Sequence, residues 1–148
     1  MKFFLMILLF CLFILVAICT YLYFLFRKKL FADMVYIGKY LKNNITFNKK
    51  NINELLSNSF ENVSQSSKFI IKNHARVGKF FYKGGDILND FFGSLGHGDV
   101  GFECNNLDYY LKIFDENLQK SSLEMKSKAL LYFKLIIGLG LAVCIILI

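Results

Sequence analysis

The chain has 148 residues, four cysteines and no proline, and its 18 lysine and arginine residues outnumber its 11 acids to give a formal charge of +7. This length allows one domain. Cys11, Cys19 and Cys144 lie in apolar runs and Cys104 stands alone, so neither a disulfide framework nor a zinc site is favoured. The positive charge would suit nucleic acid, but the basic residues are scattered and the aromatic residues have core-like spacing, so we expect no nucleic-acid partner.

Residues 3–26 form an uncharged run of 24 residues. As a helix this run is roughly 36 Å long, which exceeds the ~30 Å hydrocarbon core of a bilayer. A cleaved signal peptide would need a shorter apolar core and small residues at its end, whereas Tyr-Leu-Tyr-Phe-Leu-Phe occupies residues 21–26. The run therefore predicts an N-terminal transmembrane helix.

Residues 129–148 form a second apolar run, which Lys134 interrupts. The residues beyond Lys134 extend only about 21 Å as a helix, so a full crossing requires Lys134 to extend its ammonium group to the headgroups. We expect this run to span the membrane. Gly138 and Ala142 form a small-xxx-small pair that would allow close helix packing there, although small residues occur in any spanning helix.

The basic residues that flank the two runs predict their orientation. Arg27, Lys28 and Lys29 follow the first run, and Lys120, Lys126 and Lys128 precede the second. Under the positive-inside rule, residues 27–128 face the cytoplasm and both termini lie outside. The stretch between Arg27 and Lys134 holds 17 of the 18 basic residues and all 11 acids, a surplus of about +6 that suits a domain beside an anionic inner leaflet.

The most regular stretch runs from residue 87 to residue 118 and predicts a tight αα-hairpin. Gly96 occupies the position of a left-handed C-cap, and Asp99 is placed to cap the next helix. Apolar residues recur at helical spacing in both arms: Ile87, Leu88, Phe91, Phe92 and Leu95 in the first, and Leu107, Leu111, Phe114 and Leu118 in the second.

Further helices are expected around this hairpin. The apolar pattern of residues 30–41 continues the first spanning helix as a stalk that ends near residues 43–44, and residues 51–54 resemble a capping box before a short helix. A third helix is expected over 67–81, with Asp86 capping the hairpin, whose second helix runs on into the C-terminal apolar run. The predicted fold is all-α: a small cytoplasmic helical bundle (27–128) between transmembrane helices 3–26 and 129–148.

No set of residues predicts catalysis. His97 lies between two glycines near Asp99, but no nucleophile is close and capping already explains Asp99. His74 reads as a solvated residue in a basic run, and the Lys83-Gly84-Gly85 stretch lacks the pattern of a phosphate loop. The Asp115-Glu116 pair is typical of a solvated face, with a contact for a basic partner as the alternative. We therefore expect no enzyme activity, cofactor or metal.

The C-terminal half resembles the stage III sporulation protein AB family. The residues that carry the resemblance are Leu88, Phe91, Leu95, Gly96 and Asp99, then Leu107, Leu111 and a Phe114-Asp115 pair, then the final LIIGLGLAVCIILI span. It covers residues 87–148, with a weaker match over 30–56. Lys42 and Asn44 stand where family members have acids, the prolines expected in that segment are missing, and residues 57–83 show no match.

This resemblance implies a role in endospore formation. Family members are similar to the inner-membrane F-like platform protein of type II secretion, and they belong to a multi-protein channel complex in the mother-cell membrane around the forespore, where they dock a cytoplasmic hexameric ATPase. The resemblance implies the same partners here, and we expect the surface around Phe91 to Asp99 and the long helix to form the bundle core and part of the ATPase contact. The alternative is a two-span membrane protein whose basic middle binds anionic lipid or nucleic acid.

Overall fold

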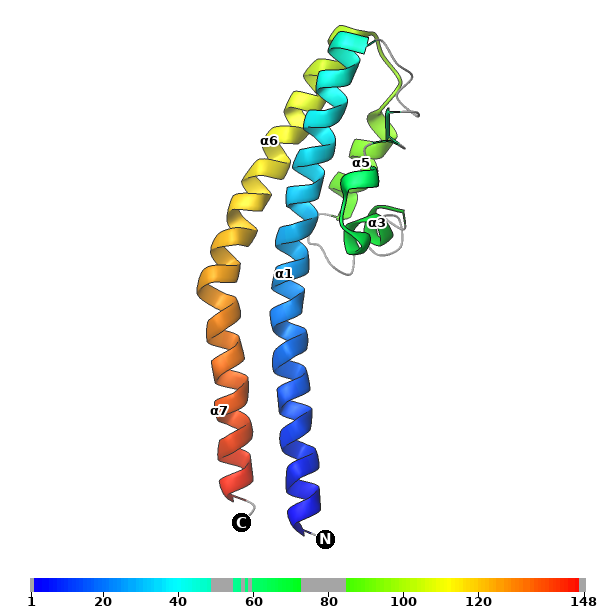
Figure 1. Ribbon diagram of the computed structural model, residues 1–148. Coiled ribbons are helices and arrows are strands. Elements are labelled where there is room, and N and C mark those ends of the chain that lie inside the picture. The colour runs from blue at the N-terminus through cyan, green and yellow to red at the C-terminus, as the bar shows by residue number, and fades with distance from the viewer. Residues whose placement is uncertain (1, 49–54, 57, 59, 73–84, 147–148) are drawn as a thin grey trace. The chain divides into compact units, whose positions relative to one another are not determined.

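The chain is all-helical, as predicted. The computed structural model describes residues 2–48, 55–56, 58, 60–72 and 85–146, and no strand occurs in these ranges. Figure 1 shows the helices in chain order, which are α1 (Lys2–Asn48), η1 (Phe60–Asn62), α3 (Gln65–Lys72), α5 (Gly85–Ser94), α6 (Val100–Glu124), the π-helical turn η2 (Met125–Ala129) and α7 (Leu130–Ile146).

The helices form two compact units. The terminal unit comprises Met1–Lys28 and Lys120–Ile148, and the central unit comprises Lys29–Gln119. Each boundary falls inside a helix, α1 in one case and α6 in the other. The domain limits expected from the sequence, 3–26, 27–128 and 129–148, stay a prediction.

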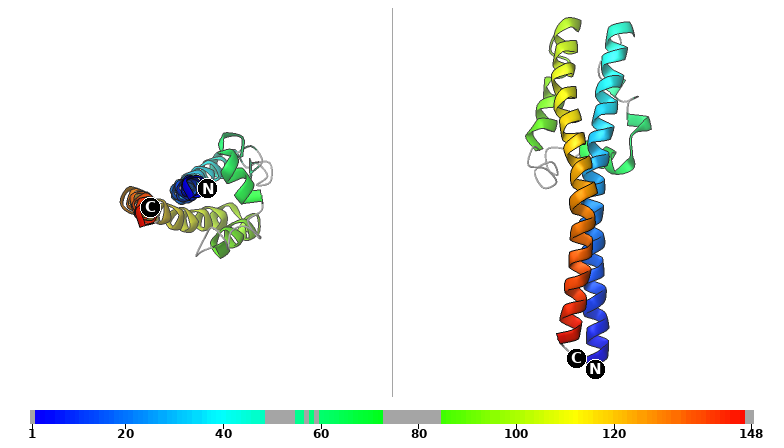
Figure 2. Two further views of the ribbon diagram at one scale, coloured as in Figure 1. Left: turned by 90° about the horizontal axis from the view of Figure 1, so that it is seen from below. Right: turned by 90° about the vertical axis from the view of Figure 1, so that its left-hand side faces the viewer.

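In the terminal unit, the first part of α1 pairs with α7 in antiparallel fashion, so both termini lie at the same end (Figure 2). The ring of Tyr21 meets that of Phe133 edge-on at 6.4 Å, and the backbone of Gly140 closely approaches Phe13. From Phe13 to Tyr21 the chain advances eight residues, and from Gly140 to Phe133 it goes back seven, so the two helices stay in step.

Both long helices have the length and composition to cross a membrane. The candidate spans lie within Phe4–Ile45 and Val100–Ile146, and only 6% and 11% of their most apolar 18-residue windows is buried. The core helix of a soluble protein would bury most of such a window. The structure is therefore compatible with a two-pass membrane protein.

The π-helical turn η2 sets which face of α7 meets α1. A π turn inserts one extra residue into an α-helix, so every later residue occupies the position that its predecessor would hold in an uninterrupted helix. Without η2, Leu139 would therefore stand where Gly140 now approaches Phe13, and its side chain would not fit. The Ser127 hydroxyl, inside the turn, donates a hydrogen bond to the Leu123 carbonyl at 2.8 Å.

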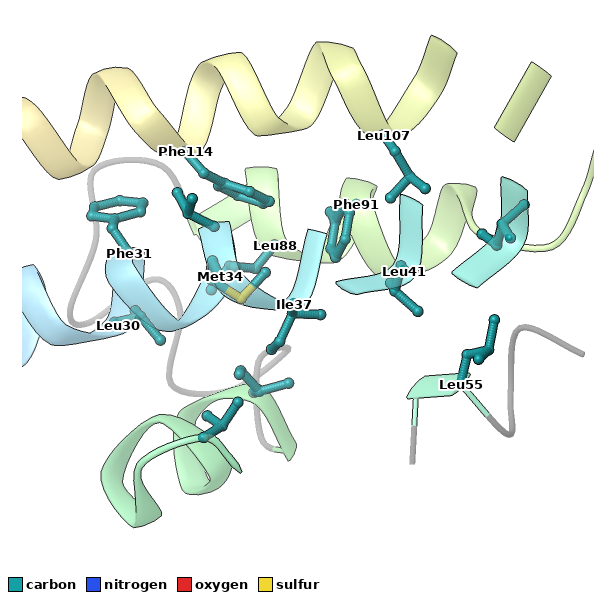
Figure 3. Packing of buried hydrophobic residues seen from close by; sticks show 14 residues of the cluster. Leu30, Phe31, Met34, Ile37, Leu41, Leu55, Leu88, Phe91, Leu107 and Phe114 are labelled. Carbon is teal, nitrogen blue, oxygen red and sulfur yellow. The ribbon is translucent and has the colours of Figure 1, made fainter. Parts of the chain in front are cut away.

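The central unit is built around one hydrophobic core, whose side chains are drawn in Figure 3. The predicted stalk positions Leu30, Met34, Ile37 and Leu41 are all almost completely buried, which confirms the helical stripe in the sequence. The α5–α6 hairpin contributes from the other side. The complete cluster is Leu30, Phe31, Met34, Val35, Ile37, Leu41, Ile45, Leu55, Val63, Ile71, Leu88, Phe91, Leu107 and Phe114.

A polar network ties the start of α3 to α1. The Ser64 hydroxyl donates to Asp33 Oδ2 at 2.6 Å, and the Ser64 amide donates to the same oxygen at 3.4 Å. The Ser67 amide in turn donates to Ser64 Oγ at 3.4 Å, the geometry of a serine N-cap. Asp33 therefore fixes, from the stalk, the point at which α3 begins.

Several expectations fall partly outside the described residues. Helix α3 covers only the first part of the helix expected over 67–81, and residues 73–81 lie outside. The capping box at 51–54 and the side chain of Asp86 also lie outside the described part. Helix α1 extends to Asn48, a few residues beyond the predicted end of the stalk.

Two glycines of α7 give a matched test of the α1–α7 pairing. A Cβ atom at Gly140 would lie 2.9 Å from Phe13 Cβ, whereas one at Gly138 would meet nothing within 4 Å. We expect Gly140→Val to destabilise the purified chain by about 1–3 kcal/mol through overpacking, and Gly138→Val to leave its thermal unfolding nearly unchanged. Equal unfolding temperatures for the two variants would contradict this pairing.

Candidate functional site

The turn between α5 and α6 is capped as predicted. Gly96 has φ 85°, the left-handed conformation expected after the last residue of a helix. Asp99 Oδ1 accepts a hydrogen bond from the Phe102 amide at 2.8 Å, and the Asp99 carbonyl accepts from the Glu103 amide at 2.9 Å. Asp99 is therefore the N-cap of α6.

The buried carboxylate of Glu103 accepts hydrogen bonds from the backbone of this turn. Glu103 is 2% exposed, and its Oε1 accepts hydrogen bonds from three successive amides, those of Gly96 at 2.9 Å, His97 at 3.0 Å and Gly98 at 3.1 Å. Amides that converge in this way form a site for an anion. Here the chain supplies the anion itself, so the turn functions as an internally closed structural element.

The buried role of Glu103 was not predicted from the sequence, although the sequence indicates it. Glu103 precedes Leu107 and Leu111 at four-residue intervals, which places an acid on the apolar seam of the second helix. A charged residue at a core position needs hydrogen-bond partners. The amides of a glycine-rich turn directly before the helix are the nearest candidates.

Close packing adds a second constraint on the turn. A Cβ atom at Gly98 would lie 2.3 Å from Phe102 Cδ1, so only glycine fits beside that ring. Asn106 Nδ2 donates to Ser94 Oγ at 2.9 Å, which joins the end of α5 to α6. The two arms are thus linked across the turn as well as through it.

The family-motif residues mostly lie in the core. Phe91 is fully buried and contacts Tyr110 and Phe114 edge-on, with ring centroids 5.3 and 5.2 Å apart. Leu88 and Leu107 are also buried, Leu95 and Leu111 are partly buried, and Asp115 is exposed and accepts a hydrogen bond from Gln119. Most of these positions therefore have a packing role in this chain.

The residues considered for catalysis or metal binding are not brought together in the described ranges. His97 is exposed in the turn, and its neighbour Asp99 is engaged in capping. Among these residues, no three His, Cys, Asp or Glu side chains gather where they could hold a metal ion. His74 and the Lys83-Gly84 pair lie outside the described part of the chain.

The outward face of α6 in the central unit carries exposed aromatic side chains, several acids and Lys112. Phe102 and Tyr109 are 56% and 63% exposed. They are seven residues apart and so lie on one side of the helix. Lys42 Nζ contacts Asp108 Oδ1 at 2.5 Å, an exposed pair that contributes little to stability. The exposed acids on or beside this face are Asp99, Asp108, Asp115 and Glu116.

The positive charge of the chain is concentrated in the terminal unit. Seven of the 18 basic residues but only one of the 11 acids, Glu124, belong to this unit, which leaves eleven basic and ten acidic residues in the central unit. The central unit is therefore close to neutral. Most of the surplus of positive charge therefore belongs to the unit that contains the apolar helices.

Glu124 is itself engaged by basic residues. Arg27 Nη1 donates to Glu124 Oε2 at 2.6 Å, and these side chains are only 20% and 17% exposed. Lys128 Nζ lies 3.3 Å from the other carboxylate oxygen. This cluster joins α1 to the end of α6 at the border of the apolar helix pair.

Gly138 and Ala142 are both exposed on α7. The glycine that closely approaches α1 is Gly140. Close packing at the Gly138–Ala142 pair would therefore require a helix other than the ones described. This role stays a prediction.

Comparison of the chain with protein-family models, with curated proteins and with solved structures gives no match.

Replacing Glu103 should show how much the turn depends on it. We expect Glu103→Ala to lower the free energy of unfolding by about 2–3 kcal/mol, because three amides lose a charged acceptor, and Asp99→Ala to lower it by about 1 kcal/mol. Thermal unfolding measures both, and hydrogen exchange should be faster at residues 96–98 in Glu103→Ala. The control is Glu116→Ala, an exposed acid on the same helix, and an equally large loss there would contradict the assignment.

Proposed function

We propose that this chain is a non-enzymatic, two-pass membrane protein that serves as a platform in a mother-cell-to-forespore channel complex and docks a cytoplasmic hexameric ATPase. The observation that carries the proposal is that α1 and α6–η2–α7 each combine an unburied apolar stretch with a stretch that builds the packed core of the central unit. Such helices would link a membrane anchor to a folded domain without an intervening loop. The hairpin motif supports the choice of family.

The side chains of the terminal unit support a consistent position in the bilayer. Tyr21, Tyr23 and Tyr132 lie near one end of the apolar pair, where tyrosine favours the membrane interface. Because Tyr21 packs on Phe133, Lys134 lies close to this tyrosine level. The ammonium of Lys134 then needs only a short extension to reach the headgroups. Residues 3–20 of α1 would cross the core over about 27 Å.

The exposed side chains limit where an ATPase could dock. Phe91 is fully buried, so it belongs to the core and not to a contact surface. Asp99, Phe102 and Tyr109 are exposed on the turn and on α6. Exposed aromatic side chains near acids can anchor a partner with a basic surface, and aromatic residues often dominate binding energy.

The alternative function is a basic middle region that binds anionic lipid or nucleic acid. The two compact units bear differently on these two ligands. A nucleic-acid domain needs a strongly basic surface, whereas the central unit has eleven basic and ten acidic residues. The charge of the terminal unit favours lipid over nucleic acid. This part of the alternative is compatible with the platform role.

Cysteine labelling tests the topology. In a background with the four native cysteines replaced by serine, Lys2→Cys should react with a membrane-impermeant maleimide in intact cells, because the N-terminus is expected outside. Lys112→Cys, on an exposed position of α6, should react only after permeabilisation. Labelling of Lys112→Cys in intact cells would exclude a cytoplasmic central unit.

Co-purification tests the docking. The detergent-solubilised full chain should retain the ATPase, and Tyr109→Ala should reduce the retained amount by roughly tenfold, the loss typical of an aromatic hot spot. Leu123→Ala is the control, because it removes an equally exposed apolar side chain from the terminal unit. Absence of the ATPase from the folded wild-type chain would remove the docking proposal.

A further inference from the structure

We propose that the terminal unit carries a binding site for the headgroups of anionic phospholipids. The site is a basic collar at the end of the apolar helix pair, made of Arg27, Lys28, Lys120, Lys126 and Lys128. The proposal rests on the spanning helices of the proposed function but not on the ATPase or the channel complex.

Positive charge remains in the collar after its internal ion pairs are counted. Glu124 is the only acid in the terminal unit, and Arg27 and Lys128 share it. Lys28, Lys120 and Lys126 have no acidic partner among the described residues. With five positive charges and one negative charge, the collar has a net charge of +4 that is available to an external anion.

Three lysines of the collar are exposed, and the collar lies where the apolar helices end. Lys120 and Lys126 are exposed, and the Lys128 side chain is 54% exposed although it contacts Glu124. The apolar stretch of α1 ends directly before Arg27, and α7 begins directly after η2, which contains Lys126 and Lys128. In a bilayer this level is occupied by lipid headgroups, so the anions in reach are lipid phosphates.

The basic residues of the collar are carried by helices of defined geometry. The Arg27–Glu124 contact joins the two helices at this level, and both side chains are largely shielded from solvent. Lys126 and Lys128 belong to the π-helical turn, a feature that is frequent at functional sites. The lysines therefore project from a backbone with a defined register rather than from a loop.

Each lysine near an anionic surface should strengthen binding by about fivefold. Full-length chain in detergent micelles with equal amounts of phosphatidylglycerol and phosphatidylcholine should show, by native mass spectrometry, more bound phosphatidylglycerol. The double variant Lys126→Gln/Lys128→Gln should lower the ratio of the two bound lipids by at least tenfold. An unchanged ratio would overturn the proposal.

Two further variants control for net charge. Lys39→Gln/Lys112→Gln removes the same charge from exposed positions of the central unit and should leave the ratio unchanged. A loss equal to that of the collar variant would show that only total charge matters and would overturn the proposal. Glu124→Gln should raise the ratio, because it releases Arg27 and Lys128 to the lipid, and a lowered ratio in a folded chain would contradict the assignment.

Circular dichroism and thermal unfolding in phosphatidylcholine alone establish that each variant is folded. A collar that binds nucleic acid would be recognised by loss of affinity for a short DNA duplex in the collar variant without a change in the lipid ratio, and that result would also overturn the proposal. Failure of ATPase co-purification would leave the lipid result intact, so the two proposals are separable.

Discussion

The central unit depends on one buried carboxylate. Glu103 gathers the three amides of the turn, and the reversal of the chain between α5 and α6 brings Phe91 onto Phe114. A buried charge without partners would cost several kcal/mol. The three amides offset part of that cost at Oε1 and fix the geometry of the turn, whereas Oε2 is buried without a hydrogen-bond partner among the residues that the structure describes. The position of Glu103 on the apolar seam of α6 means that the turn can close only when that seam faces the core. Local capping and tertiary packing are thereby coupled through a single side chain.

The terminal unit is organised by a different constraint. Lipid tails are as apolar as leucine, so helices in a bilayer gain little from hydrophobic burial and associate through close packing and polar contacts. Gly140 gives α7 its close approach to Phe13, and the Arg27–Glu124 contact supplies the polar tie at the end of the pair. The close approach at Gly140 depends on the extra residue in η2, because an uninterrupted helix would present Leu139 to α1. The π-helical turn therefore has a structural reason in this chain.

The features that could be predicted from the sequence are those that depend on interactions between residues close together in the chain. The apolar runs, the stalk spacing of Leu30 and Met34, and the caps at Gly96 and Asp99 all follow from residue type and near neighbours, and the structure confirms them. The partner of Gly140 could not be read, because it depends on the register of a distant helix. Sequence spacing singled out Gly138, and the π-helical turn that brings Gly140 to α1 has no signature in the sequence. The role of Glu103 was missed although its position on the apolar seam could have indicated it.

The distribution of charge changes the functional interpretation more than its total does. A chain of +7 suggests a polyanion as partner, either nucleic acid or anionic lipid. Division by compact unit separates them, because the central unit is nearly neutral and the surplus of positive charge lies in the terminal unit, mostly where the apolar helices end. In the proposed membrane position, charge at that level would stabilise the helix pair at the headgroup layer, whereas the outward face of α6, with its exposed aromatic side chains and acids, would suit a basic protein. We therefore propose that the two surfaces serve different partners, one in the membrane and one in solution.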